Sequence, residues 1–99
     1  MTVDIREIRV EQALVRAVES AGGDCYKFSS PARRGVPDRL VLLPGGLVCF
    51  VECKAPGRKP TELQKATHRR MRELGQRVET IDSLEAATAL VGDLARNAR

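Results

Sequence analysis

The chain has 99 residues, of which 42% are hydrophobic and 30% charged, a balance typical of one compact domain with a modest core. The net charge of +4 suits an anionic partner, but aromatic residues make up only 3% and leave little material for a surface that stacks single-stranded bases. Three cysteines without C-x-x-C spacing argue against a disulfide framework and against zinc, and no long apolar segment indicates insertion into a membrane.

The N-terminal third predicts a helix, a strand and a loop. Apolar residues recur at helical spacing over residues 5–21, which predicts an amphipathic helix that ends at Gly22 and Gly23. Residues 25–28 predict a short strand. Residues 29–35 are polar and basic, and they predict a loop.

The middle of the chain predicts a β-hairpin. Two apolar runs, residues 39–43 and 47–54, flank a Pro-Gly-Gly turn at residues 44–46. Side chains alternate between the two faces of a strand, so Glu52 and Lys54 should project together, roughly 7 Å apart along the chain.

The C-terminal half predicts a break, a helix, a strand and a last helix. Residues 55–60 contain two prolines and a glycine, and a helix follows over residues 61–74. Residues 77–81 alternate as a fourth strand, and Asp82 or Ser83 caps the last helix. The resulting order, αβββαβα, predicts the α/β class. The inner face of the helix over residues 61–74 is predicted to hold Leu63, Thr67, Met71 and Leu74.

Three charged residues of the hairpin carry the predicted chemistry. Asp38 opens the first strand and Glu52 and Lys54 close the second, so strand pairing brings the three side chains together. Two carboxylates can hold Mg²⁺ or Mn²⁺, since these ions prefer oxygen ligands. Such an ion generates a hydroxide from bound water, and a nearby lysine orients that water or offsets charge on a phosphate. The pattern predicts phosphodiester hydrolysis; the alternative is a surface ion pair at a strand end.

A longer ordered pattern surrounds these residues. It comprises Tyr-Lys-Phe-Ser-Ser-Pro at residues 26–31, Arg-Arg-Gly-Val-Pro-Asp-Arg-Leu-Val at 33–41, Val-Glu-Cys-Lys-Ala-Pro-Gly at 51–57, Leu63-Gln64, His68, Leu74-Gly75 and Asp82-Ser83. This pattern resembles the virus-type replication-repair nucleases, VRR-NUC, of the PD-(D/E)XK nuclease superfamily. The resemblance implies a restriction-endonuclease-like fold, with an αβββαβ core built on a mixed sheet flanked by helices, and a C-terminal helix.

The resemblance also implies a metal site. Asp38 and Glu52 would bind Mg²⁺ or Mn²⁺, with the carbonyl of Cys53 as a backbone ligand from the same strand. Glu11 on the first helix would be a further acidic ligand, direct or through water. Glu7 lies one turn earlier and competes for that role, and a solvated helix carboxylate is the alternative for Glu11.

Two further residues would serve the reaction. Lys54 would position or activate the attacking water, and Gln64 on the second helix would support the lysine and the water. The pattern Thr61-x-x-Gln64 is also a capping box, which closes a helix by itself. The two roles of Gln64 are compatible.

Basic residues on both sides of the acidic cluster predict contacts with the DNA backbone. An ordinary solvated surface is the alternative for any one of them. His68 is expected to contact a phosphate or lie on the surface, because no second histidine and no cysteine pair accompanies it as a metal ligand. The predicted contacts are Lys27, Arg33, Arg34, Arg39, Arg58, Lys59, Lys65, His68 and Arg69.

These features predict a single VRR-NUC-like nuclease domain over residues 1–99. We expect it to act on DNA in the cytoplasm and not to associate with a membrane. Standalone members of the family look like homodimeric Holliday-junction resolvases, and symmetric cutting of a four-way junction needs two active sites. We therefore expect a homodimer and a branched substrate. The family resemblance also suggests a phage or prophage as the source. The alternatives are nicking, flap or duplex cleavage, a DNA-binding module without catalysis, and a protein-interaction domain.

Overall fold

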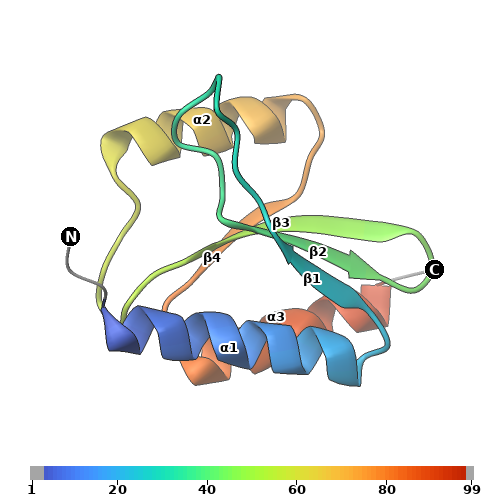
Figure 1. The fold of residues 1–99 in the computed structure, drawn as a ribbon. Coiled ribbons are helices and arrows are strands. Elements are labelled where there is room, and N and C mark those ends of the chain that lie inside the picture. Colours follow the sequence, from blue (N-terminus) through green and yellow to red (C-terminus); the bar gives the residue numbers. More distant parts are fainter. Residues whose placement is uncertain (1–3, 98–99) are drawn as a thin grey trace.

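The computed structural model describes residues 4–97, which form three helices and a four-stranded sheet (Figure 1). The elements in chain order are α1 (Ile5–Ser20), β1 (Asp24–Lys27), β2 (Arg39–Leu43), β3 (Leu47–Cys53), α2 (Glu62–Glu73), β4 (Val78–Ile81) and α3 (Leu84–Asn97). This order confirms the predicted α/β fold. The single domain over residues 1–99 stays a prediction, and residues 1–3 and 98–99 lie outside the described part. No helix within residues 4–97 is both long and apolar enough to cross a membrane.

The strands follow one another in the sheet in chain order, β1-β2-β3-β4. The pairs β1–β2 and β2–β3 are antiparallel, whereas β3 and β4 are parallel and are joined through α2. The sheet is therefore mixed, as the resemblance implies. Between β2 and β3, Gly45 and Gly46 have φ values of 90° and 79°, which glycine adopts without strain, so the chain reverses within three residues.

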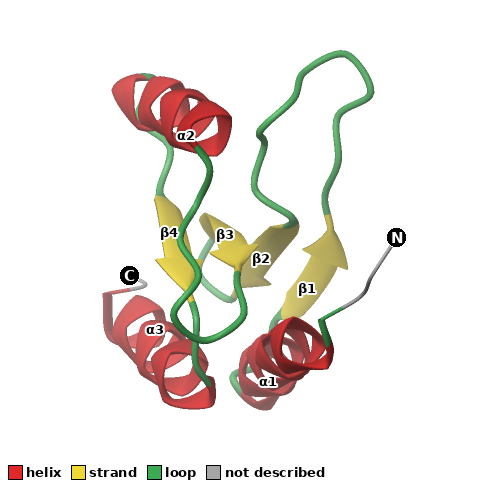
Figure 2. Cartoon of the chain, turned by 90° about the vertical axis from the view of Figure 1, so that its left-hand side faces the viewer, coloured by secondary structure: helices red, strands yellow, loops and turns green. Residues whose placement is uncertain are grey.

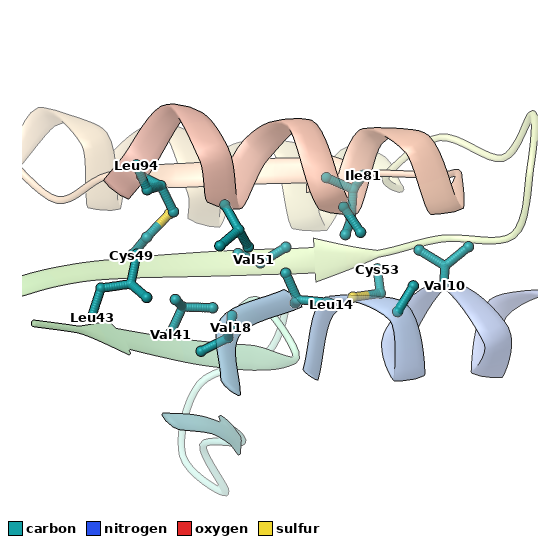
Figure 3. Close-up of a cluster of buried hydrophobic side chains, with 13 residues drawn as sticks. Val10, Leu14, Val18, Val41, Leu43, Cys49, Val51, Cys53, Ile81 and Leu94 are labelled. Atoms are coloured by element: carbon teal, nitrogen blue, oxygen red, sulfur yellow. The ribbon is translucent and has the colours of Figure 1, made fainter. Parts of the chain in front are cut away.

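The main core lies between the sheet and the pair of helices α1 and α3, which run side by side on one face (Figures 1 and 2). Figure 3 shows Leu14 and Val18 of α1 packed towards Val41 and Val51 of the strands. All four side chains are fully buried, as the helical and strand periodicities predict. This apolar layer holds the sheet rigidly against α1 and α3.

The cysteines belong to this layer. Cys49 and Cys53 are fully buried in the core, and the half-buried Cys25 packs against it; all three carry free thiols. Burial raises the pKa of the Cys49 thiol to about 12 and also raises that of Cys53, so both stay protonated at neutral pH. Cys49 and Cys53 therefore serve as small core residues, and Cys25 borders the core.

The opposite face of the sheet carries α2 and, beside it, the long segment 28–38 (Figure 2). Phe28 of that segment and Phe50 of β3 pack edge to face, with ring centroids 5.3 Å apart. This face is less completely covered than the other, since Tyr26 and Val48 remain 51% and 44% exposed. The candidate site lies on this side.

The inner face of α2 differs from the prediction. Leu63 and Leu74 are 51% and 59% exposed, so their placement on the inner face is wrong. Thr67 is buried as predicted, and the other buried residue of α2 is His68. Hydropathy misplaced this face because α2 is held by hydrogen bonds to neighbouring segments rather than by an apolar stripe.

Candidate active site

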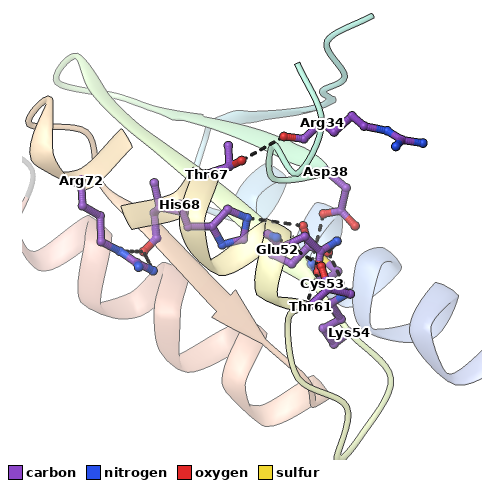
Figure 4. A network of polar contacts seen from close by, with 11 residues as sticks. Arg34, Asp38, Glu52, Cys53, Lys54, Thr61, Thr67, His68 and Arg72 are labelled. Atoms are coloured by element: carbon purple, nitrogen blue, oxygen red, sulfur yellow. Dashed lines mark hydrogen bonds and ion pairs between the residues drawn. The ribbon is translucent and has the colours of Figure 1, made fainter. Parts of the chain in front are cut away.

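Asp38 stands at the end of segment 28–38, immediately after the fully buried Pro37. The backbone N–H of Phe28 donates to the Asp38 carbonyl at 2.9 Å and extends the β1–β2 pairing to this residue. The carboxylate oxygen Oδ1 accepts the N–H of Cys53 at 3.1 Å (Figure 4). Asp38 is therefore held at the carboxyl end of β3, beside Glu52.

The environment of Asp38 disfavours its negative charge. Burial and then the charge of Glu52 raise the pKa of Asp38 to about 7, while the hydrogen bond from the N–H of Cys53 lowers it. Glu11 and Glu7 on α1 raise it further. Near neutral pH the Asp38 carboxyl is therefore partly protonated, and a bound cation would favour its ionised form.

Glu52 is the second carboxylate, and only 6% of its side chain is exposed. Its Oε2 lies 3.3 Å from Lys54 Nζ and accepts Gln64 Nε2 at 3.3 Å. Burial raises the pKa of Glu52, and the charge of Lys54 opposes that rise. The contact between Glu52 and Lys54 shows that both project from the same face of the strand end, as strand alternation predicts.

One oxygen of Glu52 has no partner. Glu52 Oε1 and His68 Nε2 are both buried without a hydrogen bond, and they lie 4.0 Å apart. A buried carboxylate oxygen without a donor is costly, and a divalent cation would satisfy it. The pair Asp38–Glu52 therefore fits Mg²⁺ or Mn²⁺. Within residues 4–97 no three acidic, histidine or cysteine side chains cluster closely enough to hold an ion alone, so backbone, water or phosphate oxygens would complete the shell.

Gln64 joins the start of α2 to this carboxylate. Its Oε1 accepts the N–H of Thr61 at 2.9 Å, and the Thr61 hydroxyl accepts the N–H of Gln64 at 3.2 Å, which is the expected capping box. Because Oε1 is engaged at the helix start, Nε2 faces Glu52 as a donor. The cap and the contact with Glu52 coexist in one side chain.

Glu11 lies in a different arrangement from the one expected. Its Oε2 accepts Arg39 Nε at 2.8 Å and lies 3.7 Å from Lys27 Nζ. This pairing neutralises Glu11 in the metal-free protein. Glu7, one turn earlier, lines a surface depression together with Lys54, and its negative charge raises the pKa of both Asp38 and Glu52. The charges of Glu11 and Glu7 both act on Asp38, and that of Glu7 also acts on Glu52.

Two predicted DNA contacts lie below the surface. Only 13% of the Arg39 side chain is exposed, because its guanidinium is bonded to Glu11 and to the carbonyl of Cys25. His68 is 1% exposed, so its expected surface position is wrong. Burial and the charge of Arg72 lower the pKa of His68 and keep the imidazole neutral near pH 7. The sequence did indicate that His68 lies near the site, because it follows Gln64 by four residues and therefore shares the same face of α2.

The remaining predicted contacts are exposed and lie on several sides of the acidic pair. They occupy the end of β1, segment 28–38, the connection between β3 and α2, and α2 itself. Lys65 is paired with Glu62 at 3.3 Å, an exposed contact of low energy. These residues are Lys27, Arg33, Arg34, Arg58, Lys59, Lys65 and Arg69.

Comparison with known proteins gives a consistent result, although no model of a protein family matches the chain. The chain is 54% identical over 86 residues to "Putative nuclease p44" of Acyrthosiphon pisum secondary endosymbiont phage 1, covering 87% of this chain and 92% of that protein. A solved structure described as "VRR_NUC domain" superposes with a TM-score of 0.77 at 34% identity, covering 95% of this chain and 98% of the other. Together with the αβββαβα order and the pairing of Asp38 with Glu52, these similarities show that the chain belongs to the VRR-NUC nuclease family.

Proposed function

We propose that the protein is an endonuclease that uses Mg²⁺ or Mn²⁺ to hydrolyse phosphodiester bonds of branched DNA. The observation that carries this proposal is the pairing of two largely buried carboxylates. The charge of Glu52 raises the pKa of Asp38 to about 7, and Glu52 Oε1 has no hydrogen-bond donor. A cation between the two would remove the repulsion and satisfy the free oxygen.

Asp38 and Glu52 would hold the ion together with the carbonyl of Cys53. The N–H and C=O of one strand residue point to the same side, and the N–H of Cys53 already faces Asp38. Glu7 would act as the further acid through a bound water, because no three acidic side chains within residues 4–97 lie close enough to hold one ion directly. Glu11 is neutralised by Arg39. When bound, the ion supplies a water of lowered pKa and stabilises negative charge on the phosphate.

Lys54 and Gln64 would act beside the ion. Lys54 lies 3.3 Å from Glu52 and is 14% exposed, so its ammonium can reach a phosphate oxygen or an attacking water at the edge of the site. Gln64 holds Glu52 Oε2 from the start of α2, so it orients the metal carboxylate rather than the water. This assignment gives Lys54 the catalytic role and Gln64 a supporting one.

The exposed basic residues would bind the DNA backbone around the scissile phosphate. Arg33 and Arg34 approach from segment 28–38, whereas Lys65 and Arg69 approach from α2. Backbone contacts carry no base sequence, so the substrate would be selected by shape. Three free thiols favour a reducing compartment, and we place the activity in the cytoplasm.

We further propose that the substrate is a four-way junction and that the active form is a homodimer. One chain carries one pair of acids, and two symmetric cuts in a junction need two such sites related by a two-fold axis. Light scattering during gel filtration measures the mass in solution. A mass of one chain at micromolar concentration would contradict the dimer without affecting the chemistry.

Cleavage of labelled DNA tests the proposal directly. Four-way junction, flap, nicked and linear duplex DNAs are incubated with Mg²⁺ or Mn²⁺, with Lys54→Ala as the catalytic control. Paired cuts in opposite junction arms, lost in Lys54→Ala, are the expected result. Cutting of flaps or duplex keeps the chemistry and replaces the substrate. No metal-dependent cutting of any DNA overturns the enzyme and leaves a DNA-binding module as the better account.

A further inference from the structure

Helix α2 is attached to segment 28–38 by a close polar contact. The hydroxyl of Thr67 donates to the carbonyl of Arg34 at 2.9 Å, and Thr67 is only 4% exposed. Next to it, the backbone at Gly35 approaches α2 so closely that a Cβ would lie 2.7 Å from Thr67 Oγ1 and 2.9 Å from the Leu63 carbonyl. Segment 28–38 therefore rests on α2 at a position where only glycine fits.

The same face of α2 also contacts Glu52. Gln64 Nε2 donates to Glu52 Oε2 at 3.3 Å. His68 Nε2 lies 4.0 Å from Glu52 Oε1 (Figure 4). Neither His68 Nε2 nor Glu52 Oε1 has a hydrogen-bond partner, and the two atoms face one another. A movement of about 1 Å would bring them to hydrogen-bond distance. One helical face thus contacts both the segment that ends in Asp38 and the side chain of Glu52.

The contact at Gly35 is close to Asp38 in the chain. Two residues separate them, and one is Pro37, which is fully buried and has a fixed φ. A displacement of Gly35 is therefore passed on to Asp38 rather than absorbed by a flexible linker. Because α2 holds Glu52 from the other side, α2 connects the two carboxylates mechanically.

We propose that Gly35, Thr67 and His68 are positioning residues that set the separation of the Asp38 and Glu52 carboxylates for a divalent ion. The inference rests on the proposed function, since it concerns the same site. Mg²⁺ demands near-ideal octahedral geometry, so a small change in that separation weakens binding. Groups outside the ligand shell typically change metal affinity about 10- to 100-fold when removed.

The first test compares two glycine variants with matched backbone strain. Gly35 and Gly46 have φ values of 82° and 79°, but an added Cβ meets Thr67 and Leu63 at Gly35 and nothing within 4 Å at Gly46. Binding of Mn²⁺ is measured by isothermal titration calorimetry on the full chain, which reports affinity independently of cleavage. We expect Gly35→Ala to bind Mn²⁺ at least about tenfold more weakly and Gly46→Ala to bind it as the wild type does.

A second test removes one hydroxyl without changing the backbone. Thr67→Val loses the bond to the Arg34 carbonyl, and Thr67→Ser retains it. The control is Thr88→Val, which removes an exposed helix hydroxyl that bonds to the Leu84 carbonyl at 3.3 Å, away from the site. We expect weakened Mn²⁺ binding in Thr67→Val, recovery in Thr67→Ser and no change in Thr88→Val. The free energy of unfolding in urea is measured for both Thr67 variants. If it is equal in the two, their difference in Mn²⁺ affinity does not come from a difference in fold stability.

His68 is tested by His68→Gln and His68→Leu. Glutamine can donate to Glu52 Oε1, whereas leucine fills space without a polar atom. We expect His68→Leu to lose Mn²⁺ affinity and His68→Gln to recover part of it.

Each outcome decides the inference. If Gly35→Ala fails to fold by circular dichroism, the Thr67 variants carry the test. Wild-type affinity in folded Gly35→Ala or in Thr67→Val overturns the positioning role. A wild type that binds Mn²⁺ but cleaves no DNA overturns the proposed function and leaves the positioning role measurable by calorimetry. A wild type that binds no Mn²⁺ in the absence of DNA overturns the positioning role, and the cleavage assay alone then decides the proposed function.

Discussion

The two faces of the sheet are built by different interactions. On one face, α1 and α3 bury apolar side chains such as Leu14, Val18 and Val91 against the strands. On the other, α2 is attached through polar groups, among them Thr67 on the Arg34 carbonyl and Arg72 on the Val78 carbonyl at 2.8 Å. The first face is held mainly by apolar contact, with the bond between Arg39 and Glu11 of α1 as a polar exception, whereas the second depends on hydrogen bonds.

Because of this difference, the apolar face mainly sets the stability of the fold, and the polar face mainly sets where the site residues lie. Apolar burial is non-directional and scales with area, so it stabilises the fold without fixing individual atoms. A hydrogen bond contributes a net free energy of only about 1 kcal/mol, but it defines where donor and acceptor lie. The acidic pair Asp38 and Glu52 sits at the end of the scaffold and takes its orientation from the polar side. Substitutions on the two faces should therefore affect different measurements.

The largest expected effect is on cleavage and comes from the polar face. Glu52→Gln removes one charge of the proposed metal site, and we expect the rate of DNA cleavage to fall at least about a thousandfold. Burial raises the pKa of Glu52, which means that its charge is unfavourable in the fold. The free energy of unfolding of metal-free Glu52→Gln at pH 8 should therefore equal or exceed that of the wild type. A clear loss of stability in urea would show that the carboxylate supports the fold.

The converse substitution lies on the apolar face. Leu14 is fully buried, and Leu14→Ala should lower the free energy of unfolding by about 2–5 kcal/mol through lost apolar contact and a residual cavity. The cleavage rate per folded molecule should remain that of the wild type at a temperature where the variant is folded. Urea denaturation and single-turnover cleavage measure the two quantities. A fall in cleavage without a fall in stability would contradict the division between the faces.

Changes of pH act on the polar face through Asp38. Its pKa is about 7 in the folded protein and near 4 in the unfolded chain. Between these values the folded state retains a proton that the unfolded state has lost, so the metal-free protein should lose stability as pH rises from about 4 to 7. Glu52 acts in the same direction, Glu7 and Glu11 of α1 add negative charge, and the Cys53 N–H opposes the shift. Urea midpoints between pH 4 and 8 measure the slope.

Asp38→Asn is the control for that slope. Asparagine cannot titrate, so the stability of this variant should depend less on pH than that of the wild type. Binding of Mn²⁺ by the wild type should strengthen as pH approaches 7, because the ion competes with the proton on Asp38. A slope of equal size in Asp38→Asn would assign the pH dependence to other groups.

The same division explains what could be predicted from the sequence. The hairpin and the apolar face follow from periodicity and turn residues, so Asp38, Glu52 and Lys54 could be brought together before the structure was seen. The inner face of α2 was predicted only in part. Thr67 was placed there correctly, but the burial of His68 was not foreseen, because the face packs on a loop whose path no periodicity describes. Hydropathy therefore selected the exposed Leu63 instead of His68.

Which of the two α1 glutamates, Glu7 or Glu11, is the further acidic ligand stays a prediction, and the sequence left that choice open for a related reason. They are one helical turn apart, so spacing treats them as equivalent. The register that places Lys27 opposite Arg39 brings both cations near Glu11 and leaves Glu7 beside Lys54. Only the packing of α1 on β1 and β2 distinguishes them.

The smallest expected effect separates an exposed from a buried arginine. Arg34 is exposed, and Arg34→Gln should make the negative slope of log affinity for junction DNA against log salt less steep by about 1. The free energy of unfolding should stay unchanged within about 0.5 kcal/mol. Arg39 is bonded to Glu11, so Arg39→Gln should lower stability and leave the salt slope unaltered. Fluorescence anisotropy with labelled junction at several salt concentrations measures both slopes. If Arg39→Gln changes the slope as much as Arg34→Gln does, then the pair with Glu11 opens when DNA binds and Arg39 contacts a phosphate after all.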